Sequence, residues 1–128
     1  MADKILLVDD DPALLKLAEK ILTQEGYKVA LAHDGLEALS VFRRAPNDYF
    51  VVVTDYHMPG LDGVSLSQKV VEIKPQTPVI LASADPELKN LGTHATNIKG
   101  CLRKPYHRKA LLTAIADSRS WFTSKNDE

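Results

Sequence analysis

Apolar runs and amphipathic segments alternate along most of the chain. Five short runs are rich in aliphatic residues and bounded by polar or turn-forming residues, which is typical of strands buried in a parallel sheet. The predicted strands are residues 4–8, 27–32, 50–54, 79–82 and 99–103. Each run is too short to cross a membrane as a helix.

The segments between these runs carry apolar residues at helical spacing. Asp11 followed by Pro12 indicates a helix start, and Asp34 with Glu37 three residues later resembles a capping box. We therefore predict helices from Pro12 to the residues before Gly26, from the Asp34 box to about Phe42, over the segment with Leu66, Val70 and Ile73, and from His107 to about Ser120. The stretch Glu87–Leu91 is a candidate start for one more helix, but the poor helix formers after it favour a short, irregular element.

Strands that alternate with helices predict an α/β fold with a doubly wound parallel sheet. Five strands in a chain of 128 residues match the flavodoxin-like (βα)5 arrangement, with strand order 2-1-3-4-5. We expect a single domain over residues 1–128, with a core of about residues 4–120 and a C-terminal tail over residues 121–128.

Composition and charge narrow the function classes. The net charge is −1, so charge alone argues for neither a nucleic-acid nor a membrane partner. The charges are unevenly spread, because residues 1–64 have an acidic excess and residues 65–128 a basic one. The one cysteine, Cys101, excludes a disulfide framework, and we expect a buried thiol in a reducing, cytoplasmic protein.

Charged residues stand at the carboxyl ends of three predicted strands. Asp9 and Asp10 follow the first strand, Asp55 ends the third, and Lys104 follows the fifth. The strand order reverses between the first and third strands, and ligands bind at such a switch point. Carboxylates gathered there repel one another and need a cation, and oxygen ligands suit Mg²⁺. The sequence therefore predicts an acidic Mg²⁺ pocket with a lysine on its rim.

The sequence blocks ILLVDDDP, VVVTDYHMPGLDG, VILASA and CLRKPY stand in the order and spacing of a known family. Together they resemble the receiver domain of two-component response regulators, over roughly residues 4–118. The resemblance implies that Asp55 accepts a phosphoryl group. It also implies that Asp9, Asp10, Asp55 and the backbone carbonyl of His57 hold Mg²⁺, with Mn²⁺ as an alternative ion.

The resemblance assigns the remaining site residues as well. Ser83 and Lys104 would bind the phosphoryl oxygens, and Pro105 would follow a cis peptide bond. The loop after the acceptor matches at Met58, Pro59, Gly60, Asp62 and Gly63. Phosphorylation would then bias a two-state surface toward a partner.

The chain departs from the family pattern at one switch position. Receivers usually have an aromatic residue three positions before the lysine, and here that position is Cys101. Tyr106 occupies the usual aromatic place after the proline and does not replace it, while Ser83 stands where threonine is commoner. The route of the output signal therefore stays open.

The resemblance implies phosphorylation by a histidine kinase or a histidine phosphotransfer protein. The output would pass to a downstream protein or to an output domain outside this chain, without direct nucleic-acid or membrane binding. We expect a signalling domain that assists its own phosphorylation and dephosphorylation, and no enzyme for a separate substrate. Two alternatives stay open: a Mg²⁺-dependent phosphatase of the haloacid dehalogenase type, and a degenerate receiver that acts only as a binding module.

Overall fold

The computed structural model describes residues 2–85 and 96–126, and it contains a five-stranded parallel sheet. The strands are β1 (Lys4–Val8), β2 (Lys28–Ala32), β3 (Tyr49–Asp55), β4 (Val79–Ser83) and β5 (Ile98–Arg103). They lie in the order β2-β1-β3-β4-β5, and all four neighbouring pairs are parallel. The predicted fold class and strand order are confirmed.

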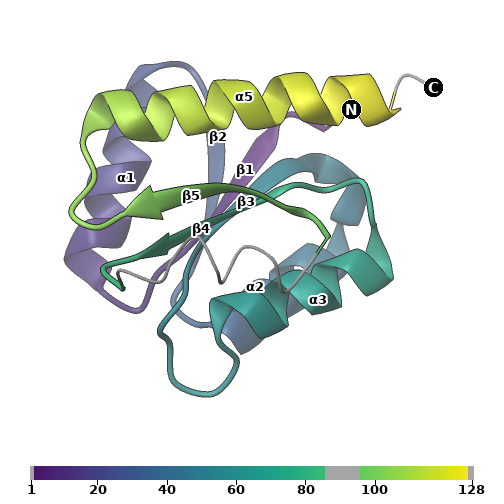
Figure 1. Ribbon diagram of the computed structural model, residues 1–128, viewed down its shortest axis with the longest axis horizontal. Coiled ribbons are helices and arrows are strands. Elements are labelled where there is room, and N and C mark those ends of the chain that lie inside the picture. Colours follow the sequence, from purple (N-terminus) through teal and green to yellow (C-terminus); the bar gives the residue numbers. More distant parts are fainter. Residues whose placement is uncertain (1, 86–95, 127–128) are drawn as a thin grey trace.

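Helices cover both faces of the sheet (Figure 1). They are α1 (Pro12–Gln24), α2 (Gly35–Arg44), α3 (Gly63–Ile73) and α5 (Arg108–Asn126), with a short 3₁₀ helix, η1, at Pro46–Asp48. Helices α1 and α5 lie on one face, and α2 and α3 lie on the other. The predicted start of a helix at Glu87–Leu91 falls outside the described residues.

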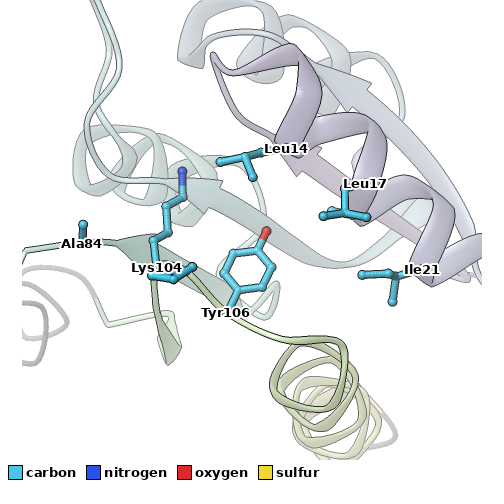
Figure 2. Close-up of a pocket in the computed structure, with 8 residues that line it drawn as sticks. Leu14, Leu17, Ile21, Ala84, Lys104 and Tyr106 are labelled. Carbon is cyan, nitrogen blue, oxygen red and sulfur yellow. The ribbon is translucent and has the colours of Figure 1, made fainter.

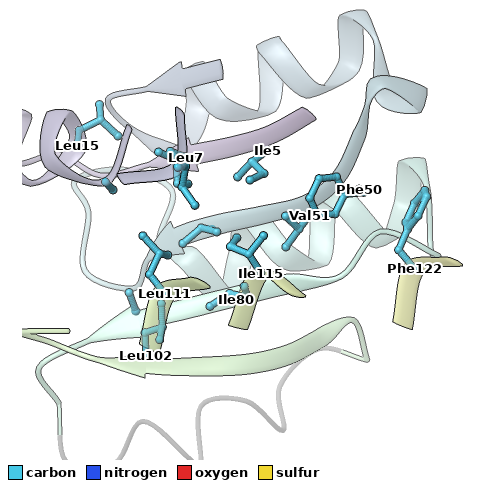
Figure 3. Close-up of a cluster of buried hydrophobic side chains, with 14 residues drawn as sticks. Ile5, Leu7, Leu15, Phe50, Val51, Ile80, Leu102, Leu111, Ile115 and Phe122 are labelled. Atoms are coloured by element: carbon cyan, nitrogen blue, oxygen red, sulfur yellow. The ribbon is translucent and has the colours of Figure 1, made fainter. Parts of the chain in front are cut away.

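Two apolar clusters fill the space between the sheet and its helices. The first joins Ile5, Leu7 and Val51 of the sheet to Leu111 and Ile115 of α5 (Figure 3). The second joins the opposite face of the sheet to α2 and α3. Because β3 is covered on both faces, every one of its residues is buried, which explains the apolar run from Phe50 to Val53.

The turn signals act as predicted at the helix starts. The Asp11 side chain accepts hydrogen bonds from the backbone N–H groups of Ala13 and Leu14, and Pro12 opens α1. The Asp34 side chain accepts from the backbone N–H of Glu37, while the Glu37 carboxylate accepts from that of His33. These bonds satisfy N–H groups that a helix start leaves without partners.

Two expectations are wrong. The last helix continues to Asn126 instead of ending near Ser120, because Phe122 is buried in the first apolar cluster and gives the extra turns a packing role. Residues 121–126 are thus part of α5 and not a tail. Cys101 is exposed instead of buried, because β5 is the edge strand and α5 packs on the face that carries Leu102.

Within the described residues, no helix combines the length and apolar character needed to span a membrane.

Candidate functional site

Three charged side chains from separate parts of the sequence meet at the carboxyl end of the sheet. Asp9 follows β1, Asp55 ends β3, and Lys104 follows β5. The Lys104 Nζ atom lies 3.0 Å from an Asp9 carboxylate oxygen and 3.2 Å from one of Asp55. All three side chains are largely shielded from solvent. The predicted switch point between β1 and β3 is therefore the place where these charges gather.

Asp10 completes an acidic cluster with Asp9 and Asp55. Each of the three residues offers a carboxylate oxygen within 4.8 Å of those of the other two. Asp10 is exposed, whereas Asp9 and Asp55 are buried. An oxygen-only set that mixes buried and exposed carboxylates fits a hard divalent cation that keeps part of its water shell, as Mg²⁺ does.

Backbone contacts orient the two buried carboxylates. One oxygen of Asp9 accepts a hydrogen bond from the backbone N–H of Asp11 at 2.9 Å, which leaves the other oxygen for Lys104. The fully buried Thr54 hydroxyl donates to the backbone carbonyl of Asp55 at 3.0 Å. The end of β3 thus has a fixed backbone and a side chain that faces the cluster.

Burial and neighbouring charges shift the pKa values of Asp55 and Lys104. Burial raises the pKa of the Asp55 carboxyl above its ordinary value, the Lys104 ammonium opposes this rise, and the Asp9 carboxylate adds to it. Burial alone would lower the pKa of Lys104, but its hydrogen bond to Asp9 and the charge of Asp55 outweigh this and raise it. Lys104 is therefore charged at neutral pH. Burial and the charge of Asp9 disfavour the charged form of Asp55, and a further cation would stabilise it.

The loop after Asp55 makes a tight turn beside the cluster. Gly60 has a φ of 79°, a left-handed conformation that suits glycine, and Pro59 precedes it. The Asp62 side chain caps α3 by accepting from the backbone N–H of Ser65. His57 is exposed in this loop, and its Nε2 atom lies 3.8 Å from an Asp85 carboxylate oxygen.

Ser83 and Lys104 end neighbouring strands. The Ser83 side chain is buried, and its hydroxyl oxygen accepts a hydrogen bond from the backbone N–H of Asp85 at 3.0 Å. The backbone N–H of Lys104 donates to the carbonyl of Ser83 at 2.9 Å, which ties the two strand ends together. The peptide bond between Lys104 and Pro105 is cis, as the resemblance implied.

An apolar cavity of about 300 Å³ adjoins the charged cluster, between α1 and the segment after β5 (Figure 2). Leu14, Leu17 and Ile21 of α1 face the Lys104 stem and Tyr106 across it. The cavity was not predicted from the sequence. Its signal is Leu17, which is 55% exposed and extends the apolar stripe of α1 beyond the face that packs on the sheet.

Comparison with known protein families identifies the kind of domain that carries this site. The model of the response regulator receiver domain matches residues 5–116. The chain belongs to this family. The phosphatase alternative gains no support, and the receiver is a signalling domain of two-component systems.

Curated relatives of this receiver domain are longer proteins. It is 36% identical to the transcriptional regulatory protein GlrR of Escherichia coli over 97% of this chain and 28% of the relative. It is 33% identical to the transcriptional regulatory protein TrcR of Mycobacterium tuberculosis over 88% of this chain and 43% of the relative. The chain therefore spans between a quarter and a half of these two relatives.

Solved receiver structures have the same fold. A receiver domain protein from Clostridium thermocellum superposes with a TM-score of 0.85 at 30% identity, covering 94% of this chain and 95% of that one. The chemotaxis protein CheY4 of Vibrio cholerae gives a TM-score of 0.83 at 28% identity, covering 92% and 99%. Receiver domains generally bind Mg²⁺ at an acidic pocket, and the acidic cluster of this chain lies where such a pocket is expected.

Proposed function

We propose that Asp55 is the phosphoacceptor of this receiver domain. The supporting observation is the position of its buried carboxylate, within 3.2 Å of the Lys104 ammonium and within 4.8 Å of oxygens from Asp9 and Asp10. This arrangement supplies a nucleophile and positive charge at one point. A carboxylate at such a point can attack phosphorus and form an acyl phosphate.

Asp9, Asp10, Asp55 and the backbone carbonyl of His57 would hold Mg²⁺. When bound, the ion neutralises negative charge on the phosphoryl oxygens and helps to orient the group for transfer. Mn²⁺ prefers similar oxygen ligands and would serve as a substitute.

Asp55, Lys104 and Ser83 would have separate roles in the phosphoryl transfer. An Asp55 oxygen forms the new bond to phosphorus while the bond from phosphorus to the donor histidine nitrogen breaks, and that nitrogen keeps the electron pair. Lys104 stabilises the charge on the equatorial oxygens, exchanging part of its contact with Asp55 for one with the phosphoryl group. Ser83 would leave its hydrogen bond with Asp85 and donate its hydroxyl to a phosphoryl oxygen, which changes the end of β4.

The donor would be a histidine kinase or a histidine phosphotransfer protein. The domain would assist its own phosphorylation and the later hydrolysis of the acyl phosphate, without turning over a separate substrate. Because the relatives are transcriptional regulators of greater length, the output would pass to a further domain or to a downstream protein. Residues 1–128 would act as one receiver unit.

Intact mass spectrometry after incubation with Mg²⁺ and acetyl phosphate tests the proposal. We expect the native chain to gain one phosphoryl group, and Asp55→Asn or removal of Mg²⁺ to abolish the gain. Asp11→Asn is the matched control, because asparagine also caps a helix and Asp11 faces α1 rather than the cluster.

Two results would contradict the proposal. Phosphorylation that persists in Asp55→Asn would place the acceptor elsewhere. A native chain that neither gains mass nor binds Mg²⁺ would be a degenerate receiver that serves only as a binding module.

A further inference from the structure

Gly63, the first residue of α3, lies against the backbone of Asp55. A methyl group at position 63 would stand 2.5 Å from the Asp55 carbonyl oxygen, 2.7 Å from the Leu81 Cδ1 atom and 3.0 Å from the Tyr56 Cα atom. The backbone N–H of Gly63 also donates to the Tyr56 carbonyl at 3.0 Å. The start of α3 thus touches the strand end that carries the proposed acceptor.

Close approach, and not backbone freedom, explains the glycine. Positive φ angles occur at Gly26 and Gly60 but not at Gly63. A side chain at position 63 would be compatible with the helix, and alanine has a higher helix propensity than glycine. The missing side chain therefore serves the contact with Asp55 and Tyr56.

Both sides of this contact are held by other parts of the fold. Helix α3 carries fully buried Leu66, and the Asn97 side-chain amide donates to the Ser67 carbonyl at 3.2 Å. Asp55 is the last residue of β3, and the backbone N–H of the next residue, Tyr56, donates to the Ala82 carbonyl at 2.8 Å. Relieving a clash of this size needs a shift of about 1 Å between the two sides, and any part of it taken by the end of β3 displaces the Asp55 backbone.

We propose that Gly63 is a positioning residue for the acceptor site. Its missing side chain sets the backbone of Asp55 and Tyr56, and through them the Asp55 carboxylate and the His57 carbonyl two residues on. The inference deepens the proposed function and rests on it. Gly63 itself would touch neither the phosphoryl group nor the ion, and it acts only through the backbone of Asp55 and Tyr56.

Gly35 offers a matched control. It is also a buried first helical residue that follows an aspartate cap, Asp34, as Gly63 follows Asp62. A methyl group at position 35 would collide with the backbone and side chain of Leu61. Gly35→Ala therefore introduces the same group in the same helical position, with a clash against Leu61 instead of the backbone of Asp55 and Tyr56.

The experiment compares Gly63→Ala, Gly35→Ala and the native chain. Calorimetry gives the Mg²⁺ dissociation constant, intact mass gives the rate of phosphorylation by acetyl phosphate, and urea unfolding gives stability. For Gly63→Ala we expect Mg²⁺ affinity to fall roughly tenfold and the phosphorylation rate at saturating Mg²⁺ to fall about 10- to 100-fold. Gly35→Ala should lose stability and keep Mg²⁺ affinity and rate close to those of the native chain.

A double variant separates the backbone contact from core packing. Leu81→Val in the Gly63→Ala background removes the Cδ1 clash but leaves the carbonyl clash, and at this fully buried position it loses less packing than alanine would. We expect it to improve stability without restoring Mg²⁺ affinity. If Gly63→Ala alone does not fold, the Mg²⁺ measurements are made on this double variant.

Several outcomes overturn the inference. These are native Mg²⁺ affinity and rate in Gly63→Ala, an equal loss in Gly35→Ala, recovery of Mg²⁺ affinity on adding Leu81→Val, or a double variant that cannot fold. The native chain tests the proposed function separately. If it neither binds Mg²⁺ nor gains a phosphoryl group, that function fails and this inference with it, whereas a phosphorylated native chain beside an unaffected Gly63→Ala overturns the inference alone.

Discussion

Lys104→Met tests how far one ammonium stabilises the acidic cluster when no divalent cation is present. Methionine keeps most of the apolar stem that lines the cavity beside α1 and removes only the charge. In the native chain the ammonium lies 3.0 Å from Asp9 and 3.2 Å from Asp55. The variant therefore leaves two buried carboxylates facing each other without their cation.

The expected loss follows from the opposing terms. At an effective dielectric constant near 20, each contact is worth about 5 kcal/mol before desolvation. Burying an ammonium costs several kcal/mol, and breaking a buried pair typically leaves a net loss of about 3 kcal/mol. We therefore expect Lys104→Met in EDTA at neutral pH to lower the free energy of unfolding by about 3 kcal/mol, or the Tm by about 10 °C.

Acid and Mg²⁺ should each reduce the difference in unfolding free energy between Lys104→Met and the native chain. Because the pKa of Asp55 is raised in the folded protein, acid protonates its carboxyl before that of the unfolded chain, so stability in EDTA increases as the pH falls through that window. The variant, which lacks the opposing ammonium, should benefit more from acid than the native chain. Saturating Mg²⁺ should also restore part of the loss, since it binds only the folded state.

On the alkaline side the sign is the same, and stability again falls as the pH rises. The pKa of Lys104 is raised above the ordinary 10.5, so its stabilising contribution is fully present below that value and is lost only as the pH rises through the folded pKa. Urea unfolding of both proteins in EDTA, at several pH values and with Mg²⁺, is the assay. A variant as stable as the native chain in EDTA, or a deficit that neither acid nor Mg²⁺ reduces, would show that Lys104 does not stabilise the two carboxylates.

Three further predictions concern the scaffold. Phe122→Ala should lower the free energy of unfolding by about 3 kcal/mol, because this ring is buried in the first apolar cluster. Urea unfolding measures the change, and a negligible loss of stability would support a tail after Ser120. Gly26→Ala should cost about 1 kcal/mol, because its φ of 90° disfavours a side chain although the space is open; a stabilised Gly26→Ala would contradict this. Although Cys101 is exposed, the neighbouring protein partly desolvates its thiol and raises its pKa. Alkylation by iodoacetamide, followed by mass, should therefore be slower at neutral pH in the folded chain than in urea and should accelerate as the pH rises, and equal rates would argue against the raised pKa.

Much of the fold could be predicted because its signals are local. The five apolar runs, the Asp caps of α1 and α2 and the glycine that ends α1 each act over a few residues, and the structure confirms them. Strand order followed from the alternation of strands and helices, because right-handed crossovers leave few arrangements. Local signals do not give the end of a helix where packing decides it, as at the end of α5.

The members of the acidic cluster were also predictable, because each follows a strand that ends at the same edge of the sheet. The distances were not predictable, since Lys104 and Asp9 are 95 positions apart in the sequence and meet only when β5 and β1 take their places. Within the described residues, the structure adds the hydrogen bond between Ser83 and Asp85 and the cavity that Leu17 lines.

The positions of strands and helices and the charged residues at strand ends follow from the sequence, because hydrophobic period, caps and turns depend on near neighbours. Three other features depend on tertiary packing: Cys101 is exposed on an edge strand, Phe122 is buried, and Gly63 must be small to admit the backbone of Asp55. Burial and close approach depend on what lies across the sheet or on the next helix, and those neighbours are distant in the sequence.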